Sequence, residues 1–216
     1  MKSTLLLATG LLCAVSGFAS TTYDNFTGYN PYYEPLGNPN TATYGETFTA
    51  PTNGDTNLQS FGFYMGGPVS ASDILMSAYI ATWTGSNAGT LVFTSPSVDY
   101  SNTGDAELTF STGGLALDPG ASYVAFLSVS DYYGLSSGTS RVSSGDATIP
   151  GGNFVYFNNG GDFASLFTSE WDETGNKPDW AFTATFVGGG NVPEPSTLML
   201  LGAGLIALGA IRRKLN

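Results

Sequence analysis

The stretch WAFTATFV, residues 180–187, decides the fold class of this chain. Its even-numbered positions hold tryptophan, alanine and two phenylalanines, and its odd-numbered positions hold alanine, two threonines and valine. Successive side chains of a β-strand point to opposite faces, so this alternation gathers the aromatic rings on one face. The pattern predicts a strand whose aromatic face lies in a hydrophobic core.

Similar apolar stretches recur on the N-terminal side of this segment. The connecting segments are rich in Gly, Ser, Asn, Asp and Thr, which are typical turn residues. Residues 117–120, Leu-Asp-Pro-Gly, place Pro and Gly at the central positions of a β-turn. Only residues 163–171 could form one or two helical turns. The predicted strands are residues 58–65, 74–83, 91–94, 107–110, 123–129, 154–157 and 180–187.

Many short strands joined by turns predict an all-β fold, an antiparallel β-sandwich. We favour a jelly-roll-like topology, because the chain is long enough for about eight or more strands. For residues 22–50 we expect irregular structure or edge strands.

The N-terminal segment has the form of a secretory signal peptide. One positive residue, Lys2, is followed by an apolar run at residues 5–15, and Gly17-Phe18-Ala19 has small side chains three and one residues before a cut. We therefore expect cleavage between Ala19 and Ser20, with the secretion machinery and signal peptidase as the first partners. A permanent N-terminal anchor is the alternative, for which the apolar run is short.

The chain closes on NVPEPSTLMLLGAGLIALGAIRRKLN, residues 191–216. Residues 197–211 carry no charge and predict a transmembrane helix, although a helix that spans a bilayer usually needs about 20 residues. Arg212, Arg213 and Lys214 follow at once, and such a basic flank stays on the cytoplasmic side. The alternative is a buried C-terminal helix of a soluble domain, but the run lacks the polar face that such a helix normally has.

This tail resembles a PEP-CTERM sorting signal, which is also described as an ice-binding-protein C-terminal domain. The signal consists of a Pro-Glu-Pro motif, an apolar helix and a basic end, in that order. The resemblance implies export by a Gram-negative-type bacterium and recognition by an exosortase, an integral-membrane transpeptidase. It also implies association with exopolysaccharide or biofilm production. The motif residues are Val192, Pro193, Glu194, Pro195 and Ser196.

The two ends therefore divide the chain into four parts. The predicted parts are a signal peptide (residues 1–19), a β-sandwich domain (20–187), a Gly-rich linker (188–192) and the sorting signal (193–216), within which the transmembrane helix covers 197–211 and the basic tail 212–214.

Charge and composition exclude several function classes for the exported part. Between residues 20 and 191, two basic residues stand against sixteen acidic ones, a net charge of −14. Such a charge argues against nucleic acid as a partner. The chain has no histidine, and its single cysteine, Cys13, lies in the predicted signal peptide. A Ser-His-Asp triad, a Cys-His pair and a histidine zinc site are therefore excluded within this sequence.

Two sets of residues are candidate binding sites. The segment DYSNTGDAE clusters oxygen ligands of the kind that Ca²⁺ prefers, but its spacing is not that of an EF-hand and such turns also occur without metal. Tyrosines in loops could stack on sugar rings, although aromatic residues more often belong to a core. The calcium candidates are Asp99, Asn102, Asp105 and Glu107, and the carbohydrate candidates are Tyr32, Tyr33, Tyr132 and Tyr133.

These observations predict a non-enzymatic protein of the cell surface or extracellular matrix, exported through a membrane-anchored intermediate, with no cofactor other than calcium. One alternative is a secreted glycoside hydrolase that uses a pair of carboxyl groups, which would need two such groups within about 10 Å of each other in a cleft. Another is a structural adhesion protein that binds other proteins through exposed strand edges.

Overall fold

The computed structural model describes residues 20–26, 32–68, 74–100, 105–135, 140–145, 149–173 and 179–188, with the backbone alone at 32–35 and 67–68. A compact unit spans Ala19–Gly189. The predicted signal peptide and the predicted transmembrane segment lie outside the described residues. Among the residues that are described, no helix has the length and apolarity needed to cross a bilayer.

The described part of this unit is all-β, and every pair of its strands is antiparallel. Two short 3₁₀ helices, η1 (Ser130–Tyr132) and η2 (Phe163–Phe167), interrupt the strand order. The strands are β1 (Ser20–Asp24), β2 (Tyr32–Leu36), β3 (Thr43–Thr49), β4 (Asn57–Pro68), β5 (Leu75–Trp83), β6 (Ala88–Thr94), β7 (Val98–Asp99), β8 (Ala106–Ala116), β9 (Ser122–Ser128), β10 (Ser140–Ser143), β11 (Phe154–Phe157), β12 (Asp172–Glu173) and β13 (Phe182–Val187).

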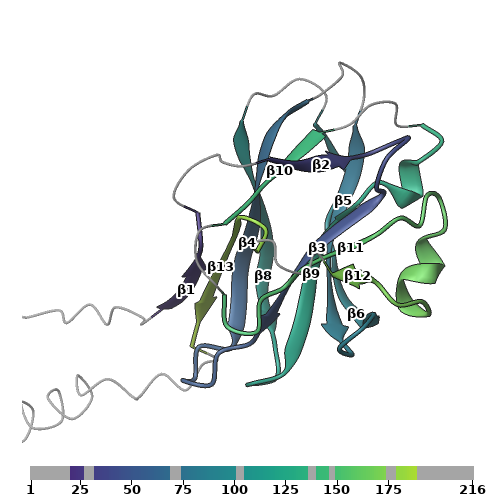
Figure 1. Cartoon of the computed structure of the whole chain (residues 1–216). Helices are drawn as coiled ribbons and strands as arrows, with labels where there is room; N and C mark the ends of the chain where they lie inside the picture. Colours follow the sequence, from purple (N-terminus) through teal and green to yellow (C-terminus); the bar gives the residue numbers. More distant parts are fainter. Residues whose placement is uncertain are drawn as a thin grey trace, which may run out of the picture. The chain divides into compact units, whose positions relative to one another are not determined.

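The strands form two sheets that lie face to face (Figure 1). The six-stranded sheet has the order β1-β13-β4-β10-β2, with β8 also paired to β4. The seven-stranded sheet has the order β12-β11-β3-β9-β5-β6, with β7 also paired to β5. The predicted all-β class and the two antiparallel sheets are thereby confirmed, whereas the jelly-roll topology stays a prediction.

Aromatic side chains from both sheets fill the space between them. Phe48 of β3 stacks on Phe182 of β13 with ring centroids 5.8 Å apart, which joins the two layers. Trp180, immediately before β13, stacks on Phe63 of β4 at 4.0 Å and meets Tyr44 of β3 edge-on at 6.3 Å. Residues 180–187 thus place their aromatic face in the core, as their alternation predicts.

A second apolar cluster covers the outer face of the seven-stranded sheet. Tyr79 of β5 and Phe126 of β9 stack at 5.0 Å, and Leu166 of η2 and Trp171 pack against this group. The short helix η2 lies on this outer side (Figure 1). Strand β9 is therefore buried on both faces, which explains why its sequence is almost continuously apolar instead of alternating.

The structure corrects the expectation for residues 22–50 in one important respect. These residues supply β1 and β2, but they also supply β3, which is a central strand paired with β9 on one side and β11 on the other. Its sequence, TYGETFT, is polar, yet six of its seven residues are buried. The polar residues of β3 did not indicate a core strand, because its burial results from pairing with β9 and β11, which are distant in the sequence.

Candidate functional site

A buried carboxyl group stands in the middle of β3. The side chain of Glu46 is 0 % exposed. Its Oε2 accepts a hydrogen bond of 2.9 Å from the backbone N–H of Trp180. Its Oε1 is buried and has no hydrogen-bond partner among the described residues. An unpaired oxygen of this kind is rare inside proteins and calls for a physical explanation.

A second carboxyl group faces the same place. Asp179 is 9 % exposed, and its Oδ2 accepts a hydrogen bond of 3.1 Å from the backbone N–H of Ile149. A Cβ added to Gly152 would stand 2.8 Å from both Oδ2 of Asp179 and Oε1 of Glu46. The two carboxylate oxygens therefore lie no further apart than twice that distance. Strand β3 supplies one acid, and the segment before β13 supplies the other.

The surroundings favour the neutral forms of both acids. Burial raises the pKa of Glu46 well above its usual value, and the negative charge of Asp179 raises it further, while the N–H of Trp180 offsets part of this change. Burial also raises the pKa of Asp179, and the N–H of Ile149 acts in the opposite direction. Two acids that approach this closely in a core cannot both carry a charge without compensation.

We expect the stability of the metal-free protein to fall as the pH rises. The folded-state pKa of Glu46 is raised above its unfolded-state pKa. Its contribution to the free energy of unfolding is therefore complete below the unfolded-state pKa and is lost as the pH rises through the folded-state pKa. The measurement is the unfolding free energy in chelator from about pH 5 to about pH 8. Glu46→Gln, which keeps the shape without the charge, should flatten this fall.

The matched control for this experiment is Glu170→Gln, at an exposed glutamate. It should leave the pH dependence as it is in the unchanged protein. A pH dependence that Glu46→Gln does not alter would show that Glu46 titrates at an ordinary pKa in the folded state.

The carboxyl pair does not offer a site for glycoside hydrolysis in this conformation. The two carboxyl groups lie closer together than the about 10 Å within which a pair of catalytic acids is found. However, both acids must reach the glycosidic bond, and Glu46 is wholly buried beneath the Trp180 segment. The two groups are close, but Glu46 is not exposed to a sugar substrate.

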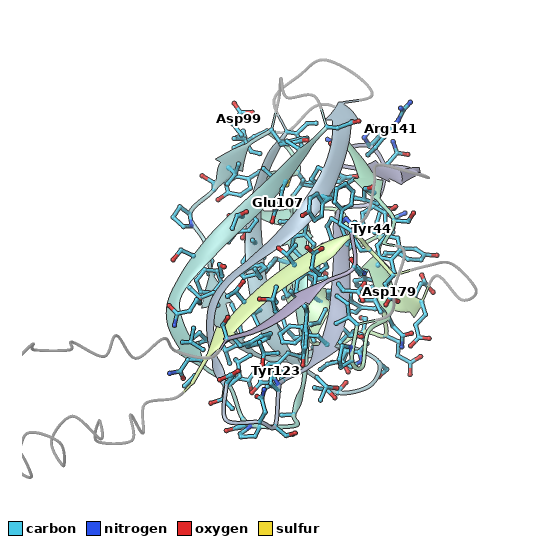
Figure 2. All side chains as sticks on the ribbon, turned by 90° about the vertical axis from the view of Figure 1, so that its left-hand side faces the viewer. Tyr44, Asp99, Glu107, Tyr123, Arg141 and Asp179 are labelled. Carbon is cyan, nitrogen blue, oxygen red and sulfur yellow. The ribbon has the colours of Figure 1, made fainter. Side chains whose placement is uncertain are left out.

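The predicted calcium ligands are only partly described. Asp99 ends β7 in the seven-stranded sheet, and Glu107 belongs to β8 in the six-stranded sheet. Figure 2 shows Asp99 at one end of the unit and Glu107 well away from it. Oε1 of Glu107 accepts a hydrogen bond of 2.9 Å from Thr183 on β13. Asn102 lies outside the described residues, so this site stays a prediction.

In the part of the chain that the structure describes, no group of three or more acidic, histidine and cysteine side chains is placed to hold a metal ion.

The predicted sugar-binding tyrosines have different surroundings. Tyr32 and Tyr33 lie on β2, and their side chains are outside the described part. Tyr132 is half-buried in η1, with its hydroxyl 3.3 Å from that of Ser77. The half-buried Tyr133 packs against the core, and its carbonyl accepts a hydrogen bond of 2.7 Å from Asn38. Neither side chain of this second pair is a fully exposed platform.

Sequence reasoning did not single out Glu46 or Asp179. The two residues are far apart in the chain, and only the pairing of β3 with β9 and β11 brings the first of them into the core. The sequence around Glu46 does contain one signal. Residues 43–49 are rich in β-forming Thr, Tyr and Phe, so a single acid among them indicates a charged group placed within a strand.

Comparison with known families identifies the C-terminal segment. Residues 191–214 match the family described as the PEP-CTERM protein-sorting motif. This chain carries that motif. The match confirms the resemblance predicted from the Pro-Glu-Pro triplet, the apolar run and the basic end. No curated protein matches the chain.

Among solved structures, the unit is similar to part of a clostridial cysteine protease, Cwp84, determined after propeptide cleavage. The TM-score is 0.50 at 10 % sequence identity, over 79 % of this chain and 40 % of the protease chain. The chain thus corresponds to less than half of that protein, and the likeness concerns the fold alone. A Cys-His pair is not available within this sequence, which has no histidine and whose single cysteine is Cys13.

Proposed function

We propose that this protein is exported to the cell surface or the extracellular matrix as a non-enzymatic β-sandwich, and that an exosortase sorts it through residues 192–196. The observation that carries the proposal is the PEP-CTERM motif at residues 191–214. The signal peptide at residues 1–19 starts export, and the apolar segment 197–211 holds an intermediate in the inner membrane until the exosortase acts.

The folded unit supports this role in two ways. Its last strand, β13, ends at Val187, and its first strand, β1, starts at Ser20 and pairs with it residue for residue. A cut between Ala19 and Ser20 and a cut within residues 192–196 would therefore leave the sheets complete. The net charge of −14 between residues 20 and 191 keeps such a protein soluble outside the cell.

The intact mass and location of the protein in its own host test this proposal. We expect a form that ends within residues 192–196 outside the cell, and a form with the full tail in the membrane fraction when the exosortase gene is deleted. Glu194→Ala should reproduce the deletion, because it removes the charge that the enzyme's pocket would read, whereas Glu170→Ala on the folded unit should not. A tail that persists in every strain would make the apolar segment a permanent anchor.

A role in adhesion is the second candidate, and the edge strand β6 favours it. Leu91 and Val92 on this strand are 38 % and 36 % exposed, and its sequence, AGTLVFT, contains no charge. An uncharged sheet edge can pair with a strand of another protein. Binding of matrix proteins that survives Val92→Lys would exclude this edge as the contact.

Association with exopolysaccharide is the finer part of the proposal. It rests on the association of such sorting signals with exopolysaccharide production and on the four tyrosines that the sequence offers as sugar-binding candidates. A pull-down with the host's own exopolysaccharide tests it. A protein that stays unbound would remove sugar binding and leave the sorting proposal intact.

A further inference from the structure

Three oxygen atoms converge beside Gly152. A Cβ at this position would stand 2.8 Å from Oε1 of Glu46, 2.8 Å from Oδ2 of Asp179 and 2.9 Å from the carbonyl oxygen of Ile149. Glycine has no side chain, so the three oxygens can approach one another here. They come from β3, from the segment before β13 and from the turn before β11, which are distant in the sequence.

Hydrogen bonds from backbone N–H groups hold these oxygens in place, but they do not compensate the charges of two carboxylates. The N–H of Trp180 donates to Oε2 of Glu46, and the N–H of Ile149 donates to Oδ2 of Asp179. The Ile149 carbonyl oxygen accepts a hydrogen bond of 2.7 Å from the N–H of Gly152, which leaves it one lone pair. Oε1 of Glu46 is left buried and without a donor among the described residues, and it points to the place where the other two oxygens gather. An unpaired buried carboxylate oxygen is costly, so the arrangement lacks a positive partner.

We propose that Glu46, Asp179 and the Ile149 carbonyl form a binding site for Ca²⁺. Calcium takes hard oxygen ligands, combines carboxylates with backbone carbonyls, tolerates irregular geometry and completes its shell with water. One divalent cation balances the charges of the two carboxylates. Mg²⁺ fits less well, because it requires near-octahedral geometry and gives up its water reluctantly.

The position of the site is compatible with an extracellular calcium module. Asp179 is 9 % exposed to solvent and Gly152 is partly exposed, so the cation enters from that side. The wholly buried Glu46 forms the inner wall of the site. Extracellular modules bind calcium with dissociation constants of roughly 10⁻⁴–10⁻³ M. The site is separate from the segment between Asp99 and Glu107, and Figure 2 shows Asp179 far from both.

The test uses the full chain, purified in detergent and treated with chelator. Added CaCl₂ at about ten times the dissociation constant should raise the Tm by about 4 °C. Glu46→Gln and Asp179→Asn should each abolish the rise, while the controls Glu170→Gln and Asp172→Asn, at exposed positions, should keep it. Titration calorimetry with CaCl₂ on the unchanged protein should show binding that Asp179→Asn removes, even if Glu46→Gln fails to fold.

Two results would overturn the proposal. If the two acids simply share a proton, CaCl₂ will produce neither a Tm shift nor binding heat. If the calcium response survives Glu46→Gln and Asp179→Asn but is lost in Asp99→Asn, calcium binds at the segment predicted from the sequence instead.

Discussion

Replacing Trp180 by alanine is expected to lower the free energy of unfolding by about 4 kcal/mol, since truncating a large buried ring removes its transfer energy and leaves a cavity. The side chain is 0 % exposed. Its ring stacks on Phe63 at 4.0 Å and contacts Tyr44 and Phe154 of the opposite sheet at 6.3 and 5.9 Å. The loss would therefore weaken the contact between the two layers and not one layer alone.

The measurement is urea unfolding of the full chain in detergent, followed by circular dichroism because the substitution removes a fluorophore. Trp180→Phe is the matched control. It retains a ring against Phe63 and loses the hydrogen bond of 3.3 Å from Nε1 to the Tyr64 carbonyl, so its cost should be well below that of alanine. A cost for alanine under about 1 kcal/mol would mean that Trp180 is not a core residue in solution.

The same region shows how far the sequence predicts this fold. The strict alternation of residues 180–187 identifies both β13 and the face that it buries, and the stretch 154–157 coincides with β11. In these segments the apolar residues themselves indicate which positions are buried. Strand β8 (Ala106–Ala116) is longer than the predicted residues 107–110. The prediction missed its second half because that half is polar and contains glycine, and it is a strand because it pairs with β4.

The candidate site was harder to predict for a related reason. A carboxyl pair is recognised from sequence when both acids belong to one motif with fixed spacing, as in a metal-binding loop. Here one acid lies on β3 and the other precedes β13, and only tertiary structure makes them neighbours. The sorting motif is the opposite case, since residues 191–214 form one continuous signal and needed no fold to be recognised.

Replacing Gly45 by alanine is the second substitution with a large expected effect, about 2–3 kcal/mol of lost stability from overpacking. Gly45 lies on β3 between Phe126 of β9 and Val155 of β11. A Cβ there would stand 2.9 Å from Cγ2 of Val124, 3.1 Å from the Ala125 carbonyl oxygen and 3.1 Å from Cβ of Phe126. Two of these three atoms belong to the backbone or lie next to it, so side-chain rotation can move only Cγ2 of Val124 and leaves the other two contacts in place.

Glycine within a strand often marks such a close approach of the backbone of a neighbouring strand. Relief would require β3 and β9 to separate, and because Glu46 is the next residue, its hydrogen bond to Trp180 would be disturbed as well. The control is Gly134→Ala, where an added Cβ meets no atom within 4 Å. Thermal unfolding of both variants decides the matter: Gly45→Ala should unfold several degrees lower and Gly134→Ala should not. Equal melting temperatures would mean that β3 packs against β9 more loosely than these distances require.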